Sequence, residues 1–148
     1  MSEHKFLAHL RKDHNEQKAL GKKLCAAKEP GKREELRQQF HESLLPHMLG
    51  EEASMFKMLI DSDDEDARDD GLESTQEHHV AKLVLRELMD LSPESDIFKA
   101  KAAVLDELNR HHIEEEETAI FAHLNRLCDN KKLAALFKQY EEAEEKAK

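Results

Sequence analysis

Residues 47–56 read HMLGEEASMF, and residues 112–121, which begin 65 positions later, read HIEEEETAIF. Each stretch has a histidine, three residues, a pair of glutamates, two residues, an apolar residue and a phenylalanine. A histidine and a glutamate four positions apart lie on the same face of a helix. The repeated pattern therefore predicts two helices that each present a His–Glu pair to a common interior.

The composition predicts a helical fold in one domain. The chain has 148 residues, enough for one hydrophobic core, and only 4 Gly and 3 Pro interrupt it. Leu, Ala, Glu and Lys dominate, and these residues favour helices. The spacing of apolar residues predicts five helices, over residues 3–27, 33–60, 72–91, 96–127 and 131–147. We expect an all-α, antiparallel up-down-up-down four-helix bundle, with the short fifth C-terminal helix packed across one end.

An internal repeat relates the two halves of the predicted bundle. Shifting the second helix by 65 positions places Glu52 on Glu117, and shifting the first helix by 64 places Asp13 on Glu77. The single domain therefore divides into two diverged helix hairpins, residues 1–62 and 63–127. Such hairpins are expected to pack with approximate two-fold symmetry.

The charge and the cysteines limit the classes of function. A formal net charge of -10 disfavours nucleic acid and anionic membranes as partners. No apolar run reaches transmembrane length, and the N-terminal stretch has no apolar secretory region. Helix geometry places Cys25 and Cys128 on the order of 40 Å apart, too far for a disulfide. We expect a cytoplasmic protein with reduced cysteines, and an acidic, solvated linker at residues 61–71.

The apolar stripes predict which polar residues face the interior. His47 and Glu51 continue the stripe of the second helix. On the third helix His78 continues the stripe, while His79 is turned about 100° away. The predicted inward set is His14, His47, Glu51, His78, His112 and Glu116.

Two residues of this set have neighbours of the same type. His111 precedes His112, and Glu116 lies in a run of four glutamates. The register set by the repeat favours His112 and Glu116, and Glu115 and Glu117 remain the alternatives to Glu116.

The burial of four imidazoles and two carboxylates predicts a pair of metal ions. Ionised carboxylates and imidazoles without partners are costly in a core. Two glutamates can bridge two ions, and two histidines can complete each ion. Carboxylate and imidazole suit Fe, Mn or Zn, and the lack of thiolates argues against a structural zinc site. We expect a pair of Fe, Mn or Zn ions, with positions open for a bridging solvent species and a small ligand.

At these residues the sequence resembles the hemerythrin-like family, also called HHE cation-binding domains. The resemblance covers residues 3–127 and rests on four motifs in order, DHNEQ at 13–17, HMLGEE at 47–52, EHHVAKLVL at 77–85 and HHIEEEETAIF at 111–121. It implies a non-heme di-iron centre in an up-down four-helix bundle, with the same six residues as ligands. The cofactor that it implies is two Fe ions with a bridging oxo or hydroxo group, and Mn or Zn are the alternative metals.

The sequence departs from the pattern that the resemblance implies for oxygen-carrying members. Lys82 stands where those members have the second histidine of HxxxH, and the fourth helix has HxxxE in place of HxxxxD. The chain is more similar to the branch linked to iron–sulfur-cluster repair and to NO, peroxide or iron handling.

Three functions are compatible with these residues. The first is a dimetal protein that binds, senses or detoxifies O2, NO or hydrogen peroxide, with weak peroxidase, catalase-like or oxidase activity left open. The second is an iron storage or delivery protein for iron homeostasis or iron–sulfur repair. The third is a metal-free helical interaction module. Monomer and homodimer remain alternatives.

Three further predictions concern residues near the predicted site. Pro46, inside the second helix, predicts a local kink without a functional role. The alternative is that the bend, together with Gly50, aims His47 or opens a path for a small ligand. Lys82, one turn from His78, is predicted to point to solvent. His123 is predicted to pack at one end of the bundle.

Overall fold

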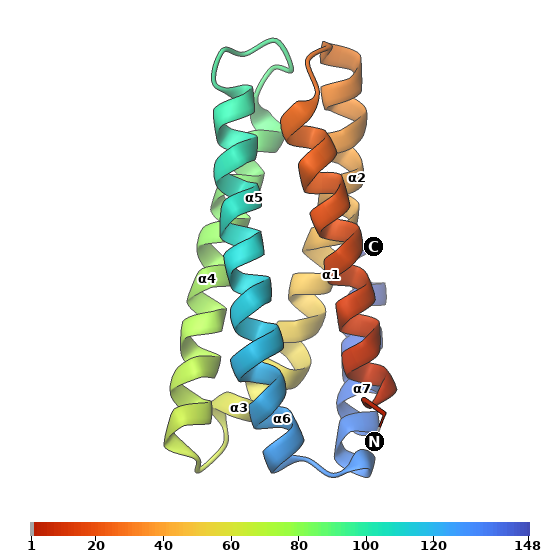
Figure 1. Ribbon diagram of the computed structural model, residues 1–148, viewed down its shortest axis with the longest axis vertical. Helices are drawn as coiled ribbons and strands as arrows, with labels where there is room; N and C mark the ends of the chain where they lie inside the picture. Colours follow the sequence, from red (N-terminus) through yellow and green to blue (C-terminus); the bar gives the residue numbers. More distant parts are fainter. Residues whose placement is uncertain (1) are drawn as a thin grey trace.

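The computed structural model describes residues 2–148, and the regular structure in that range is entirely helical (Figure 1). The elements in chain order are α1 (Lys5–Ala26), α2 (Pro30–Glu51), η1 (Glu52–Phe56), α3 (Lys57–Ile60), α4 (Glu65–Asp90), α5 (Phe98–Glu115), η2 (Glu116–Ile120), α6 (Phe121–Leu127) and α7 (Asn130–Lys146). The all-α class expected from the composition is confirmed. Within residues 2–148, no helix combines the length and the apolarity needed to cross a bilayer.

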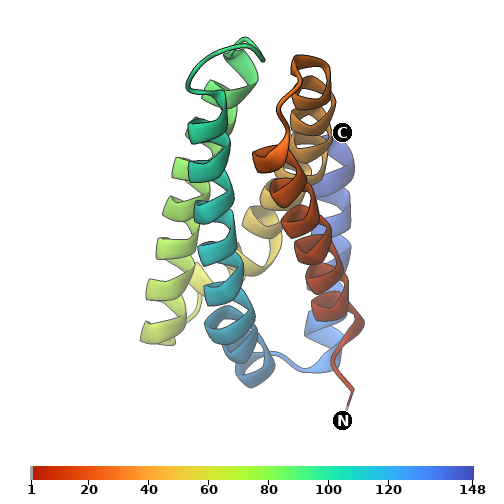
Figure 2. The ribbon, with the colours of Figure 1, turned by 45° about the horizontal axis from the view of Figure 1, so that its top comes forward.

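Four long rods lie side by side along the long axis of the molecule and are connected at alternate ends (Figures 1 and 2). The rods are α1, α2–η1–α3, α4 and α5–η2–α6. α1 packs against α2 and α5, and α4 packs against α5.

The acidic segment at residues 61–71 is mostly helical, so its prediction as a linker was wrong. α4 begins at Glu65 because the side chain of Asp64 accepts a hydrogen bond from the backbone N–H of Ala67 at 3.0 Å. Glu65 and Asp66 in the first turn also interact favourably with the positive end of the helix dipole. The negative charges that suggested a solvated linker therefore stabilise a helix N-terminus.

The last helix, α7, lies lengthwise against the bundle, so the prediction that it packs across one end was wrong. It contacts α1, α2 and η1 and runs upward along the outside of these elements (Figure 2). Leu133, Leu136 and Tyr140 recur at helical spacing and are all buried. The ring of Phe137 stacks on Phe6 of α1, with ring centroids 5.2 Å apart. The apolar stripe of α7 extends along the helix, so its burial requires a surface of similar length, and the side of the bundle provides that surface.

The hydrophobic core consists of two apolar clusters. The lower cluster contains Phe6, Leu10, Met55, Phe56, Leu59, Ile120, Leu124 and the buried residues of α7. The upper cluster contains Leu24, Phe40, Leu44, Leu85, Leu88, Phe98 and Leu105. Along each rod, the predicted metal ligands lie between residues of the two clusters. Cys25 packs against the upper cluster and Cys128 against the lower one, and both are free thiols as predicted.

Candidate metal centre

The six residues predicted to face inward lie together in one buried layer between the two apolar clusters. None of the six exposes more than 6% of its surface, and Glu51 and Glu116 expose none. Their neighbours of the same type point elsewhere, since His79 is exposed and the side chain of His111 is 66% exposed. Helical periodicity therefore selected the inward histidine correctly in both pairs.

The first group of donor atoms, called position 1, is formed by His14, His47, Glu51 and Glu116. Nε2 of His47 lies 3.1 Å from Oε2 of Glu51, and Nε2 of His14 lies 3.1 Å from Oε1 of Glu116. The donor atoms of the group lie within 4.8 Å of one another. Two donors about 2.1 Å from one ion and at right angles to each other are separated by about 3 Å. The spacing at position 1 therefore fits one metal ion.

The second group, called position 2, is formed by His78, His112 and the same two glutamates. Nε2 of His78 lies 3.2 Å from Oε1 of Glu51, and Nε2 of His112 lies 3.0 Å from Oε2 of Glu116. Each carboxylate thus presents one oxygen to each position. This arrangement is suited to two ions bridged by two carboxylates.

Each of the four histidines is oriented by a carboxylate from another helix, and these four acids are called the outer carboxylates. In each pair Nδ1 of the ring faces a carboxylate oxygen, which favours a proton on Nδ1 and leaves the lone pair on Nε2. The pairs are His14 with Glu117 at 2.6 Å, His47 with Asp13 at 3.1 Å, His78 with Glu52 at 2.9 Å and His112 with Glu77 at 2.9 Å.

The chemistry of this donor set fits a pair of cations. All four carboxylate oxygens of Glu51 and Glu116 are buried and have no hydrogen-bond partner, and neither has Nε2 of His14. Nitrogen lone pairs and carboxylate oxygens that face each other repel unless protons or cations lie between them. Two divalent ions would satisfy every one of these atoms at once. The buried His–Glu clusters can therefore hold metal.

The family model of the hemerythrin HHE cation binding domain matches residues 5–124. The chain belongs to this family. The resemblance seen in the four sequence motifs is thereby confirmed. No curated protein and no solved structure matches the chain. The matched region of this hemerythrin HHE domain ends before α7, so the contacts that α7 makes with the centre are described from the structure of this chain alone.

The outer carboxylates of this hemerythrin HHE domain were not assigned a role from the sequence. The repeat had already paired Asp13 with Glu77 and Glu52 with Glu117, and the structure shows that all four residues contact histidines of the centre. For Glu52 and Glu117, the sequence feature that could have predicted this contact is the second glutamate of each HxxxEE pattern. Its first glutamate faces the centre, and its second reaches a histidine on another rod.

The two long rods that carry the glutamates are each interrupted by one π-helical turn, which the sequence analysis did not predict. η1 follows Glu51 directly, and η2 begins at Glu116. π-helical turns are rare and occur frequently at functional sites. Ser54 within η1 donates its hydroxyl to the backbone carbonyl of Gly50 at 2.7 Å. The two turns lie where consecutive glutamates serve different histidines.

Tyr140 of α7 is a second contact that the sequence analysis assigned only to the core. It is fully buried, and its hydroxyl lies 2.8 Å from Oδ2 of Asp13 and 2.9 Å from Nδ1 of His47. Oε2 of Glu144 lies 2.9 Å from the same hydroxyl. A Cβ atom on Gly50 would lie 2.7 Å from two carbons of the Tyr140 ring. Gly50 therefore lets the ring approach α2, which gives this glycine a packing role.

Two basic residues form ion pairs with outer carboxylates. Nζ of Lys82 lies 2.8 Å from Glu52, and Nη1 of Arg11 lies 3.1 Å from Glu117. The prediction that Lys82 points freely to solvent was wrong, because Glu52 lies within its reach and its side chain is only 30% exposed. His123 pairs with Asp70 at 2.7 Å, away from the six inward residues.

Without metal, the pKa values of His14, His47 and His112 are raised above that of a free imidazole. Burial lowers the pKa of His47, but Glu51 and Asp13 outweigh it and raise the pKa to about 9. Burial likewise lowers the pKa of His112, and Glu116 and Glu77 raise it to about 10. Protons therefore occupy the metal-free centre near neutral pH, and metal ions must displace them.

Proposed function

We propose that this hemerythrin HHE domain binds two iron ions. The protein would use this pair of ions to bind, sense or detoxify a small diatomic molecule or peroxide. The proposed ligands are His14, His47, Glu51, His78, His112 and Glu116. The observation that carries the proposal is the layer of four buried carboxylate oxygens without hydrogen-bond donors, which face four histidine Nε2 atoms. Mn and Zn are the alternative metals for such a donor set.

The number of donors leaves room for a further ligand. Each position has two imidazole nitrogens and two carboxylate oxygens. Iron and manganese commonly take five or six ligands, so four protein donors leave coordination sites free. Bound iron supplies redox chemistry and open coordination sites for O2, NO or peroxide. The outer carboxylates keep a proton on each Nδ1 and direct each Nε2 lone pair toward the ion.

The surroundings favour a small ligand. The ring of Phe56 lies 4.8 Å from that of His78, and the ring of Phe121 lies 6.3 Å from that of His14. Both phenylalanines belong to the lower apolar cluster and are almost fully buried. Their rings exclude water from one side of the layer, and close packing there leaves no place for a large organic substrate.

A second candidate function is the storage or delivery of iron. The observation that favours it is a surface group, formed by Glu77, His111 and Glu115, whose donor atoms lie within 4.8 Å of one another. Glu77 also contacts His112 at position 2. An ion could pass between such a group and the centre with little rearrangement, which would suit exchange.

The test is the metal content of untagged protein prepared from iron-replete cells without oxygen. We expect about two ions per chain, as the two donor groups require. We also expect the absorption spectrum of the reduced protein to change with O2, NO or peroxide. The matched variants are Glu51→Gln, which removes a bridging carboxylate, and Glu114→Gln, which changes an exposed glutamate of α5.

The outcomes separate the candidate functions. Two retained ions with a spectral response support the first function, and two ions lost to a mild chelator without such a response support storage or delivery. No metal, or only traces of zinc, would refute both functions and leave a metal-free helical module. In that case His47→Ala combined with Glu51→Ala should leave folding intact or improve it.

A further inference from the structure

Several contacts at position 1 have an equivalent at position 2, in residues that the internal repeat relates. His14 corresponds to His78, and the outer carboxylates of these two residues, Glu117 and Glu52, correspond as well. Each of these acids also pairs with a basic side chain, Glu117 with Arg11 and Glu52 with Lys82. On these contacts alone the two positions would hold their ions equally.

The symmetry ends at the contacts of the other two outer carboxylates. At position 1, Asp13 is bonded to the hydroxyl of Tyr140, which is fully buried. At position 2, the corresponding Glu77 has His111 at 3.9 Å, and the side chain of His111 is 66% exposed. The side chains of Asp13 and Glu77 are similarly exposed, at 20% and 22%, so the difference between the two positions is the buried hydroxyl of Tyr140 that holds Asp13.

The contact of Tyr140 is built into the packing of α7. Its ring fits over Gly50, where a Cβ atom would lie 3.1 Å from the backbone oxygen of Tyr140 as well as close to the ring. Its hydroxyl joins Asp13, His47 and Glu144 in one cluster. His47 therefore cannot turn away from position 1 unless its contacts with Asp13 and Tyr140 are broken.

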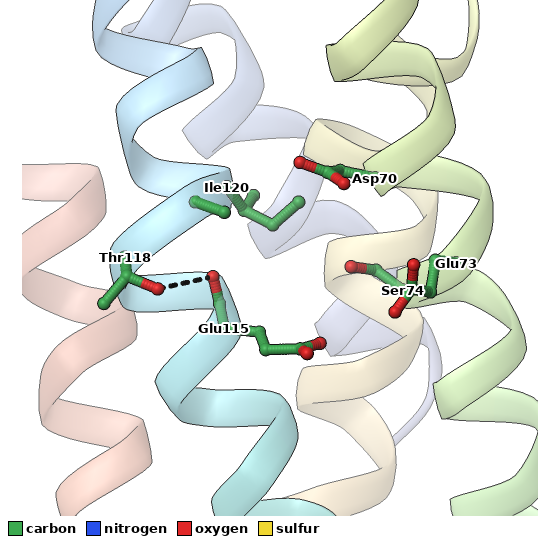
Figure 3. Close-up of a pocket in the computed structure, with 7 residues that line it drawn as sticks. Asp70, Glu73, Ser74, Glu115, Thr118 and Ile120 are labelled. Atoms are coloured by element: carbon green, nitrogen blue, oxygen red, sulfur yellow. Dashed lines mark hydrogen bonds between the residues drawn. The ribbon is translucent and has the colours of Figure 1, made fainter.

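Position 2 lies near a groove of about 220 Å³ between α4 and η2 (Figure 3). Its lining includes Ser74, which precedes His78 by one helical turn, and Ile120, which follows Glu116 by one turn. Glu115, beside the bridging Glu116, also lines the groove, and its backbone oxygen is bonded by Thr118 (Figure 3). A groove of about 240 Å³ lies equally near position 1, because it is lined by Ser43, which precedes His47 by one turn. The grooves are therefore alike at the two positions, and the difference between them lies in the contacts of Tyr140.

We propose that the two positions release their ions at different rates, and that Tyr140 is the positioning residue that retains the ion at position 1. The inference rests on the proposed function, because it requires both positions to be occupied. Release of an ion requires a histidine to swing away. At position 2 Nδ1 of His112 contacts Glu77. At position 1 Nδ1 of His47 contacts both Asp13 and the hydroxyl of Tyr140, and this second contact holds the ring in place.

The test follows the transfer of metal from the loaded full-length protein to an excess of a coloured chelator. We expect two phases of equal amplitude, one ion per chain in each. Tyr140→Phe removes only the hydroxyl and should accelerate the slow phase roughly 10-fold, since loss of an outer hydrogen bond to a ligand typically weakens metal binding 10- to 100-fold. The fast phase should not change.

One pair of variants assigns the phases, and a third variant controls for packing. Asp13→Asn should accelerate the slow phase and Glu77→Gln the fast phase, because these residues hold the corresponding histidines of the two positions. Phe137→Leu is the control for packing, since Phe137 lies on the same helix and contacts Phe6 rather than Asp13. It should leave both phases close to those of the unaltered protein.

The outcomes are distinct. A protein that binds two ions and releases both in one phase refutes this inference but leaves the proposed function standing. Equal acceleration of both phases by Tyr140→Phe also refutes it, because that result indicates general loosening of the bundle. A protein that takes up no metal refutes the proposed function, and this inference with it.

Discussion

The stability of the metal-free protein should fall steeply as the pH rises from about 6.5 to about 9. The pKa of His47 is raised from 6.5 to about 9 in the folded chain. A histidine whose pKa is higher in the folded state than in the unfolded state stabilises the fold fully at pH values below its unfolded-state pKa. This stabilisation is lost as the pH rises through its folded-state pKa. One pKa unit corresponds to about 1.4 kcal/mol, so His47 alone should contribute about 3 kcal/mol that is lost across this range. His112, with a pKa of about 10, adds a loss that extends to higher pH.

Urea unfolding of chelator-treated protein at several pH values measures this loss. We expect His47→Asn to remove its own share of the slope between pH 6.5 and 9 and to leave the share that comes from His112, whose pKa is raised over the same range. His79→Asn, at an exposed position, should preserve the whole slope. In metal-loaded protein the slope should be much smaller, because ions occupy the place of the protons. The reasoning would be refuted if metal-free protein were equally stable at both ends of the range, or if His47→Asn retained the full slope.

Three further outcomes are expected from single substitutions. Glu51→Gln should reduce the metal content to less than half, and Glu114→Gln should not; equal metal in both proteins would exclude Glu51 as a bridging ligand. Gly50→Ala should lower the free energy of unfolding by about 1–3 kcal/mol in thermal melts, because its Cβ collides with Tyr140, whereas Gly31→Ala, which meets no atom within 4 Å, should not destabilise. Asp64→Ala should cost about 1 kcal/mol through loss of the cap of α4, and an unchanged melting temperature would contradict that role.

The helical class and the inward residues were predictable because helical periodicity is a local property. When a histidine continues an apolar stripe, as His78 does, the helical period shows that its side chain faces the core and that the side chain of the adjacent residue does not. The same geometry distinguished His78 from His79 and Glu116 from Glu115. Two hairpins with the same pattern, each with one histidine on its first helix and a His–Glu pair on its second, place the six side chains in one layer.

The outer contacts were less predictable because they depend on neighbouring helices. Whether Glu52 reaches His78 depends on the π-helical turn and on the distance between two rods, neither of which has a clear signature in sequence. Tyr140 gave the signal of a core residue, and only the lengthwise packing of α7 brings its hydroxyl to Asp13. The start of α4 was missed for a different reason, because acidic residues suit both a linker and a helix N-terminus.

The sharing of Glu51 and Glu116 gives the centre the character of a subunit interface within one chain. Each half of the chain supplies both histidines of one position, and each half sends a single glutamate across to the other. This is the arrangement of an isologous dimer, in which the same surface of each partner meets itself about a two-fold axis. Neither hairpin alone can complete a position, so assembly of the two halves and assembly of the centre are one event.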